Sequence, residues 1–207
     1  MEDKARIAVM VSGGGTNLQA IIDAQKSGLI EKGEITMVIS NREDAYAIER
    51  AKAAGIENYI VTKKEYGGQQ GFENKVRELI DSHDIDLIVL AGFLTILSMD
   101  FVRYYDHKII NIHPALIPSF CGPGMYGIHP HEAALERGVK VTGATVHYVN
   151  EVADGCEIIA QKAVNIMDDD TPQSLQLRVM QQAEWLILPV AIAKLSRKIV
   201  ADREKEK

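Results

Sequence analysis

The chain has 207 residues, of which 46% are hydrophobic and 25% are charged, as is ordinary for a globular protein with a substantial core. A formal net charge of -6 argues against a protein whose main task is to grip a nucleic acid backbone, but it is compatible with a local pocket for one phosphate. The longest mainly apolar stretch, residues 87–99, is too short to cross a membrane. The first residues form no secretory signal, and the two cysteines have no metal or redox spacing. We therefore expect a cytoplasmic protein, monomeric or homodimeric, that acts on small molecules and has no nucleic acid or membrane partner.

Strands and helices alternate in the first half of the chain. Short apolar runs that predict buried strands are separated by segments in which apolar residues recur every three or four positions. The expected strands are residues 7–11, 35–39, 59–61 and 87–91, and the expected helices are residues 17–25, 44–54 and 72–82. Gly55 is expected just past the end of the second helix. This order predicts an α/β fold with a Rossmann-like, doubly wound and mostly parallel sheet.

The pattern changes in the second half. Apolar residues predict a strand over residues 109–112, and residues 114–128 hold too many glycines and prolines to form a helix or strand. The sequence then predicts a helix over 131–137, strands over 141–149 and 158–164, and a long last helix over 171–200.

The last helix has clear start signals and a predicted buried face. Thr171 is the expected N-cap and Pro172 the first helical residue. Its buried stripe is expected to contain Leu175, Val179, Ala183, Leu186 and Val190. The charged residues 201–207 are expected to fray.

The segment Asn111-Ile112-His113-Pro114 is the most informative part of the sequence. Asn111 and His113 point to the same face at the end of a strand, because side chains alternate along it. Pro114 disfavours helical geometry at His113, so the chain leaves the strand extended. An amide can stabilise a developing oxyanion, and an imidazole can carry a proton near neutral pH. This pair predicts an enzyme.

A glycine-rich turn, residues 12–17 (SGGGTN), joins the first strand to the first helix. Its backbone N–H groups and the helix N-terminus favour an anion, with Gly14, Gly15, Thr16 and Asn17 as candidate contacts. The turn lacks the last glycine of a dinucleotide fingerprint and the lysine of a P-loop. A phosphate monoester therefore fits better than NAD or ATP, and the alternative is a tight turn without a ligand.

Other segments are ambiguous from the residues alone. Residues 91–97 begin at the carboxyl end of a central strand, where α/β sheets bind ligands, but such apolar stretches are more often core. Asp154 could approach His113 and raise its pKa, yet an Asp-Gly turn is the commoner role of this dipeptide. Arg178, Gln181 and Glu184 share one face of the last helix by spacing, and such a face is normally solvated.

Three further groups carry weaker signals. His129 and His131 have no third ligand at metal spacing, and consecutive acids at residues 168–170 diverge, so we expect no metal site. Cys121 has no evident base beside it and is not expected to be a nucleophile.

Several motifs in one order resemble the folate-dependent phosphoribosylglycinamide formyltransferases of purine synthesis. They are residues 11–18 (VSGGGTNL), 90–93 (LAGF), 111–114 (NIHP), 141–147 (VTGATVH) and Asp154. The resemblance covers residues 7–190. It implies the formyltransferase fold in one domain over residues 1–207, with a phosphate-binding half over 1–105 and a catalytic and folate-binding half over 106–200.

The resemblance also implies a reaction and its residues. The formyl group would pass from 10-formyltetrahydrofolate, the co-substrate, to the amine of the glycinamide ribonucleotide, without a metal. Residues 114–128 would form a lid. The implied catalytic group is Asn111, His113 and Asp154. The implied ribonucleotide contacts are Gly14, Gly15, Thr16, Asn17, Pro114 and Glu184. The implied folate contacts are Leu94, Thr95, Ile96, Leu97, Asn111, Asn150, Glu151 and Ala153.

Two departures from the family pattern and three alternatives accompany this interpretation. Cys156 and Glu157 follow Gly155 where a Gly-Pro pair is usual, and Gln69 stands where many members have an arginine that would contact the folate tail. Formyltetrahydrofolate hydrolases usually carry an extra N-terminal domain, and methionyl-tRNA formyltransferases usually carry a C-terminal barrel. We expect room for neither of these additions in this chain. A phosphate-binding module without catalysis is the non-enzymatic alternative.

Overall fold

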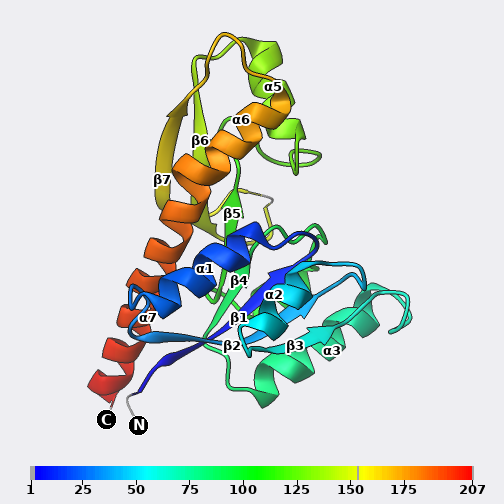
Figure 1. Ribbon diagram of the computed structural model, residues 1–207. Coiled ribbons are helices and arrows are strands. Elements are labelled where there is room, and N and C mark those ends of the chain that lie inside the picture. Colours follow the sequence, from blue (N-terminus) through cyan, green and yellow to red (C-terminus); the bar gives the residue numbers. More distant parts are fainter. Residues whose placement is uncertain (1–2, 153, 207) are drawn as a thin grey trace.

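A mixed sheet forms the centre of the protein in a computed structural model, which describes residues 3–152 and 154–206 (Figure 1). Within these residues the sheet has seven strands in the order β3-β2-β1-β4-β5-β6-β7. The strands are β1 (Ala5–Val11), β2 (Gly33–Ser40), β3 (Glu57–Ile60), β4 (Leu87–Leu90), β5 (Ile109–His113), β6 (Val141–Tyr148) and β7 (Ile158–Asn165). Strands β1 to β5 pair in parallel, whereas β6 and β7 are antiparallel to their neighbours. The predicted doubly wound, mostly parallel fold is confirmed.

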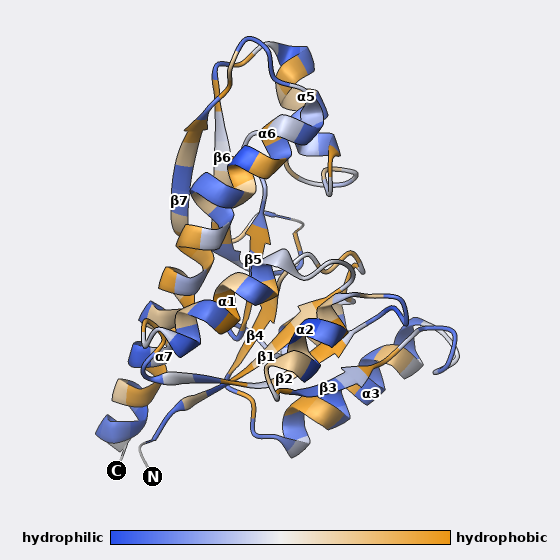
Figure 2. Ribbon diagram, viewed as in Figure 1, coloured by the Kyte–Doolittle hydropathy of each residue, from blue (hydrophilic) through white to orange (hydrophobic). Residues whose placement is uncertain are grey.

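Helices cover both faces of the sheet. One face packs against α1 (Thr16–Lys26), α2 (Ala47–Ala53), α6 (Pro172–Val179) and α7 (Trp185–Glu206). The other face packs against α3 (Gln69–Ser82) and α4 (Met99–Tyr104), while α5 (His129–Arg137) lies beside α6 near the antiparallel strands (Figure 1). Apolar residues are concentrated in the central strands (Figure 2), which are buried on both sides as parallel strands generally are.

The strand order reverses between β1 and β4, since β2 and β3 lie on one side of this pair and β5 on the other. Ligands of open α/β sheets bind at the carboxyl ends of the strands beside such a reversal. The loops that follow β1, β4 and β5 therefore define where a site is expected.

Most predicted elements are present, with shifted ends. The helix predicted over 44–54 begins at Ala47, and the strand predicted over 59–61 is Glu57–Ile60. Gly55 follows the C-cap of α2 in the left-handed conformation (φ 68°), as predicted. Helix α4 was not predicted; it is six residues long, and its N-cap Ser98 accepts a hydrogen bond from the N–H of Phe101. No described helix is long and apolar enough to cross a membrane.

The last helix differs from the prediction in its middle. Thr171 and Pro172 start it as expected, but residues Met180–Glu184 (η1) form a wider π-helical turn. Leu175, Val179 and Ala183 are buried as predicted. Glu184 is buried as well, five residues after Val179, and the stripe continues from it in steps of four through Leu188 and Ile192. Leu186 and Val190 were therefore wrongly placed in the core and are half-exposed, because the wide turn adds one residue to the α-helical register.

The charged tail that was expected to fray is helical as far as the structure describes it, because α7 continues to Glu206. Arg203 forms ion pairs with Asp3 and Asp86, at 2.9 Å between Nη1 and Oδ1 of Asp3, and so ties the last turns to the start of β1 and β4. Charge in the sequence suggested solvation, but here it supplies tertiary contacts.

Deleting Gln182, an exposed residue of the π-helical turn, is expected to leave a continuous α-helix with the midpoint of thermal unfolding unchanged or higher. The deletion shortens the gap from Val179 to Glu184 to four residues, which matches the α-helical repeat. Deleting the exposed Lys194 is the matched control, expected to cost about 2 kcal/mol or more because it rotates Leu195 and Val200 out of the core. Equal losses in both variants, measured by circular dichroism, would contradict this prediction.

Candidate active site

Three polar side chains meet where β5 pairs with β6. Asn111 lies opposite His147 in the strand register, and His113 lies opposite Thr145. The carboxylate of Asp154, in the turn after β6, is 3.6 Å from Nδ1 of His113 and 3.4 Å from Nε2 of His147. The structure therefore brings together Asn111, His113 and Asp154, which are 43 residues apart in the chain at most. Asp154 is not only an Asp-Gly turn residue.

His147 belongs to the same cluster, although the sequence analysis gave it no role. Its Nδ1 is 2.7 Å from the carbonyl oxygen of Tyr148, which can only accept, so Nδ1 carries the proton. Its Nε2 faces both Asp154 and the side-chain amide of Asn111, which is 3.2 Å away. Once the antiparallel register of β5 and β6 is known, its position opposite Asn111 would predict that it belongs to the site.

His113 is buried with an acceptor near each ring nitrogen. Nε2 is 2.8 Å from the carbonyl oxygen of Phe120, and Nδ1 faces the Asp154 carboxylate. Burial lowers the pKa of His113, and this effect outweighs the raising effects of Asp154 and of the Phe120 carbonyl. Asp154 acts in the expected direction, raising the pKa of His113, while burial opposes it, so the expectation that Asp154 holds His113 protonated stays a prediction.

Asp154 stays ionised. Burial alone would raise its pKa, but hydrogen bonds from His147 and from the N–H of Gly122, together with the charge of His113, hold the pKa below its ordinary value. Its backbone has a positive φ of 54°, an uncommon conformation for a residue other than glycine. The ionised Asp154 in turn favours the protonated form of His113, against the effect of burial.

The glycine-rich segment after β5 covers this cluster. The Phe120 carbonyl contacts His113, and the N–H of Gly122 donates to Asp154 Oδ2 at 2.8 Å. At the base of the segment, Thr145 Oγ1 donates to the carbonyl of Ala115 at 2.7 Å and accepts from the N–H of Ile117. Backbone groups of Phe120 and Gly122 are site components that residue types cannot reveal.

The glycine turn lies at the carboxyl end of β1, as predicted. Gly15 is the N-cap of α1 with a φ of 70°, and no side chain caps this helix. Among the described residues, the N–H groups of Gly14, Gly15 and Thr16 have no hydrogen-bond partner. Free N–H groups at a helix N-terminus form a favourable place for an anion.

Glu184 joins the glycine turn to the last helix. Asn17 Nδ2 donates to Glu184 Oε2 at 2.7 Å, and both side chains are buried. Burial raises the pKa of Glu184 to about 7, with a smaller lowering effect from Asn17. Arg178 instead pairs with Asp170, and Gln181 is exposed, so the three residues do not share one solvated face.

The segment after β4 is an exposed loop rather than core. Leu94 is 53% exposed and Ile96 is 86% exposed. The N–H of Leu94 donates to Ser12 Oγ at 2.8 Å, and Asn41 Nδ2 donates to Thr95 Oγ1 at 2.6 Å. These bonds hold the loop against the ends of β1 and β2, next to the glycine turn.

Gln69 and Glu73 of α3 hold the same loop from the other side. Gln69 Nε2 donates to the carbonyl of Ile96 at 3.1 Å and to the Glu73 carboxylate. The buried Glu73 also accepts hydrogen bonds from the N–H and the hydroxyl of Ser98. Gln69, the departure noted in the sequence, thus has a structural contact with residues 93–98.

The turn before Asp154 is only partly described. Asn150 Oδ1 accepts from the N–H of Val152 at 2.9 Å, and Glu151 forms an exposed ion pair with Arg103. Ala153 lies outside the described residues. Pro114 and Leu97 are half-buried on the segments that follow β5 and β4.

The histidines and acids considered for a metal are not gathered. His129 is exposed and lies 2.9 Å from Glu132, while burial lowers the pKa of His131 to about 4. No group of three or more His, Cys, Asp or Glu side chains among the described residues is placed to hold a metal ion. Burial raises the pKa of the Cys121 thiol.

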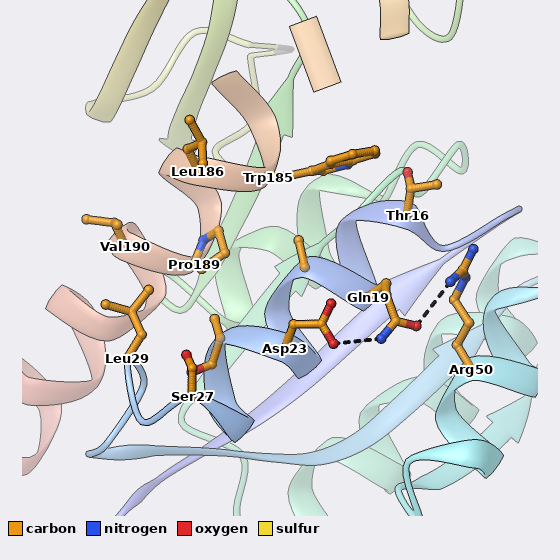
Figure 3. A pocket seen from close by; sticks show the side chains of 12 residues that line it. Thr16, Gln19, Asp23, Ser27, Leu29, Arg50, Trp185, Leu186, Pro189 and Val190 are labelled. Carbon is orange, nitrogen blue, oxygen red and sulfur yellow. Dashed lines mark hydrogen bonds between the residues drawn. The ribbon is translucent and has the colours of Figure 1, made fainter. Parts of the chain in front are cut away.

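A groove of about 710 Å³ runs between α1 and α7 and begins beside the glycine turn (Figure 3). Thr16 and Arg50 lie at this end, and Trp185, Leu186 and Val190 form an apolar wall. The half-exposed Leu186 and Val190 face this groove as a result of the π-helical turn.

Comparisons with known proteins agree with the fold and motifs. Residues 5–192 match the formyl transferase family. The chain is 38% identical over 187 residues to phosphoribosylglycinamide formyltransferase of Escherichia coli, which covers 90% of this chain and 85% of that protein. It is 41% identical over 189 residues to the human trifunctional purine biosynthetic protein adenosine-3, covering 91% of this chain but 18% of that protein. The chain thus spans less than a fifth of its trifunctional relatives.

Solved structures give the same result. Glycinamide ribonucleotide transformylase 1 from Symbiobacterium toebii superposes with a TM-score of 0.88 at 36% identity, covering 96% of this chain and 90% of that one. Phosphoribosylglycinamide formyltransferase from Coxiella burnetii superposes with a TM-score of 0.85 at 40% identity, covering 94% and 88%.

Replacing Glu184 by Gln is expected to stabilise the protein increasingly as the pH rises. The pKa of Glu184 rises from 4.5 to about 7 on folding, so the folded state binds its proton more tightly than the unfolded chain. The contribution of this group to the free energy of unfolding therefore falls between pH 4.5 and pH 7, by about 3 kcal/mol. The advantage of E184Q over wild type, measured by urea unfolding, should be larger at pH 8 than at pH 4 by that amount. E136Q, which changes an exposed carboxylate, is the control, and a pH-independent E184Q effect would sink the prediction.

Proposed function

Because the chain belongs to the formyl transferase family, we propose that it transfers the formyl group of 10-formyltetrahydrofolate to the amine of 5-phosphoribosylglycinamide, a step of purine biosynthesis. The observation that carries the proposal is the pairing of His113 with Asp154 at the carboxyl end of β5. The carboxyl end of β1, in the same sheet, carries the glycine turn, whose N–H groups have no partner within residues 3–152 and 154–206. The names of its relatives support this choice of substrates. We also propose a single domain, with residues 1–105 holding the phosphate and 106–200 the catalytic group, in a cytoplasmic protein.

The ribonucleotide would bind across the glycine turn. Its phosphate would accept hydrogen bonds from Gly14, Gly15 and Thr16, whose N–H groups have no partner among the described residues. The buried Asn17 and Glu184 would contact the ribosylglycinamide part, with Pro114 beside it. The unpartnered Oδ1 of Asn17 supports a polar ligand here.

The folate would bind along the exposed loop after β4. Leu94 and Ile96 present apolar surface, and the backbone of residues 94–97 offers hydrogen-bonding groups to a flat heterocycle. The proposed folate contacts are Leu94, Thr95, Ile96, Leu97, Asn111, Asn150, Glu151 and Ala153. The formyl donor would then lie next to the glycine turn, because Leu94 and Thr95 are hydrogen-bonded to Ser12 and Asn41 at the ends of β1 and β2.

The chemistry would be direct attack of the amine on the formyl carbon. A C–N bond to the substrate amine forms, and the carbonyl oxygen becomes an oxyanion that accepts a hydrogen bond from Asn111 and is stabilised by the charge of His113 once that residue is protonated. The attacking amine gives up one proton to Nδ1 of His113, where the Asp154 carboxylate stabilises the charge. The bond from carbon to N10 of the folate then breaks, and His113 passes the same proton to that nitrogen.

A spectrophotometric assay of folate deformylation tests the proposal. The purified protein is mixed with 10-formyltetrahydrofolate, with and without the glycinamide ribonucleotide. Turnover only with the ribonucleotide supports transfer. Turnover without it indicates a hydrolase, and no turnover in a folded protein indicates a binding module.

Replacing His113 by Ala is expected to lower kcat at least roughly 100- to 1,000-fold, because a lost oxyanion donor costs about 2.7–4 kcal/mol. Folding should be preserved, as judged by far-UV circular dichroism. H129A removes an exposed imidazole and is the matched control, expected to retain wild-type kcat. Full activity in H113A would rule out the assigned role.

A further inference from the structure

Helix α2 donates hydrogen bonds to two consecutive carbonyl groups of the glycine turn. The N–H of Ala47 donates to the carbonyl of Gly13 at 3.0 Å. Nε of Arg50, one turn later on the same helix, donates to the carbonyl of Gly14 at 2.8 Å. Both contacts come from one side of the turn.

A trans peptide unit is planar, and its C=O and N–H point in opposite directions. Holding the Gly13 carbonyl towards α2 therefore directs the N–H of Gly14 away from α2. Holding the Gly14 carbonyl in the same way directs the N–H of Gly15 away from α2. These are two of the N–H groups without a partner among the described residues.

Close packing against α2 fixes where Gly15 lies. A Cβ at Gly15 would be 2.6 Å from the Cβ of Ala47, and Gly15 has a φ of 70°. Only glycine fits this close approach without strain. The position of the turn is set by packing, whereas the direction of its second peptide depends on Arg50.

Arg50 is itself held in place. Its Nη1 donates to Gln19 Oε1 at 3.0 Å, and Gln19 Nε2 donates to Asp23 at 2.9 Å, as Figure 3 shows. Its guanidinium lies 5.1 Å from the ring centre of Tyr46. Among the described residues no carboxylate forms an ion pair with Arg50, so its positive charge is not neutralised beside the turn.

We propose that Arg50 is a positioning residue for phosphate, which orients the Gly14–Gly15 peptide so that its N–H faces the bound anion and adds an unneutralised positive charge. This inference rests on the proposed function, because it concerns the phosphate of the same ribonucleotide. Without the Arg50 contact, the peptide is free to rotate and to present its carbonyl oxygen to the anion, which repels it.

The test is a titration with inorganic phosphate, followed by ¹H–¹⁵N NMR of the amide groups, in wild type, R50M, R50K and K52M. In wild type, the amide signals of Gly14, Gly15 and Thr16 should shift on saturation. R50M should bind phosphate roughly 10- to 100-fold more weakly, as is typical for loss of a hydrogen bond to a charged group, and should lose the shift at Gly15. R50K should recover most of the affinity, because an ammonium group can donate to the same carbonyl.

K52M is the matched control, since Lys52 is on the same helix but pairs with Glu49 in an exposed ion pair. It removes one positive charge and should leave phosphate affinity unchanged. In steady-state kinetics, R50M should raise KM for the ribonucleotide with little change in kcat or in KM for the folate.

The proposal would be overturned if R50M bound phosphate with wild-type affinity, or if R50M and K52M lost equal amounts of phosphate affinity. It would also be overturned if a wild-type protein that transfers formyl groups showed no phosphate-induced amide shifts. This last outcome leaves the proposed function intact. Absence of formyl transfer in a wild-type protein that shows the expected Arg50-dependent phosphate shifts would instead refute the proposed function alone. Thermal unfolding of each variant verifies that it is folded.

Discussion

Burial of His113 between a carboxylate and a backbone carbonyl is the constraint on which the arrangement of the site depends. Both ring nitrogens of this buried imidazole face an acceptor, one from the loop after β5 and the other from the turn after β6. The same carboxylate accepts from Gly122, so loop and turn are held to each other as well as to His113. Strand β5 thus provides the side chain, while two separate loops set its electrostatic environment.

Charge or hydrogen bonding acts against burial at three ionisable groups of the candidate site. At His113 burial dominates and lowers the pKa, whereas at Asp154 hydrogen bonds dominate and the carboxylate remains ionised. At Glu184 burial dominates with only Asn17 to oppose it. Because little solvent reaches these groups, the charges around them act more strongly than they would at the surface.

The sequence was sufficient for features that depend on local rules. Residue type and spacing predict the order of strands and helices, the glycine turn, the cap at Thr171 and the Asn-His pair at a strand end. The family resemblance added Asp154 to that pair. Features that depend on register or on backbone groups were missed. The π-helical turn moved Leu186 and Val190 out of the core, and His147, Phe120 and Gly122 entered the site through strand pairing and backbone contacts. No periodicity encodes those contacts.

The continuous last helix has a mechanical consequence. Its first part packs beside β6, its later part packs on β1 and β2, and Arg203 fixes its end to Asp86, so one rod spans both halves of the molecule. Bending between these two ends of the sheet would have to break that rod or its packing. The last helix therefore opposes any movement of β6 relative to β1 and β2.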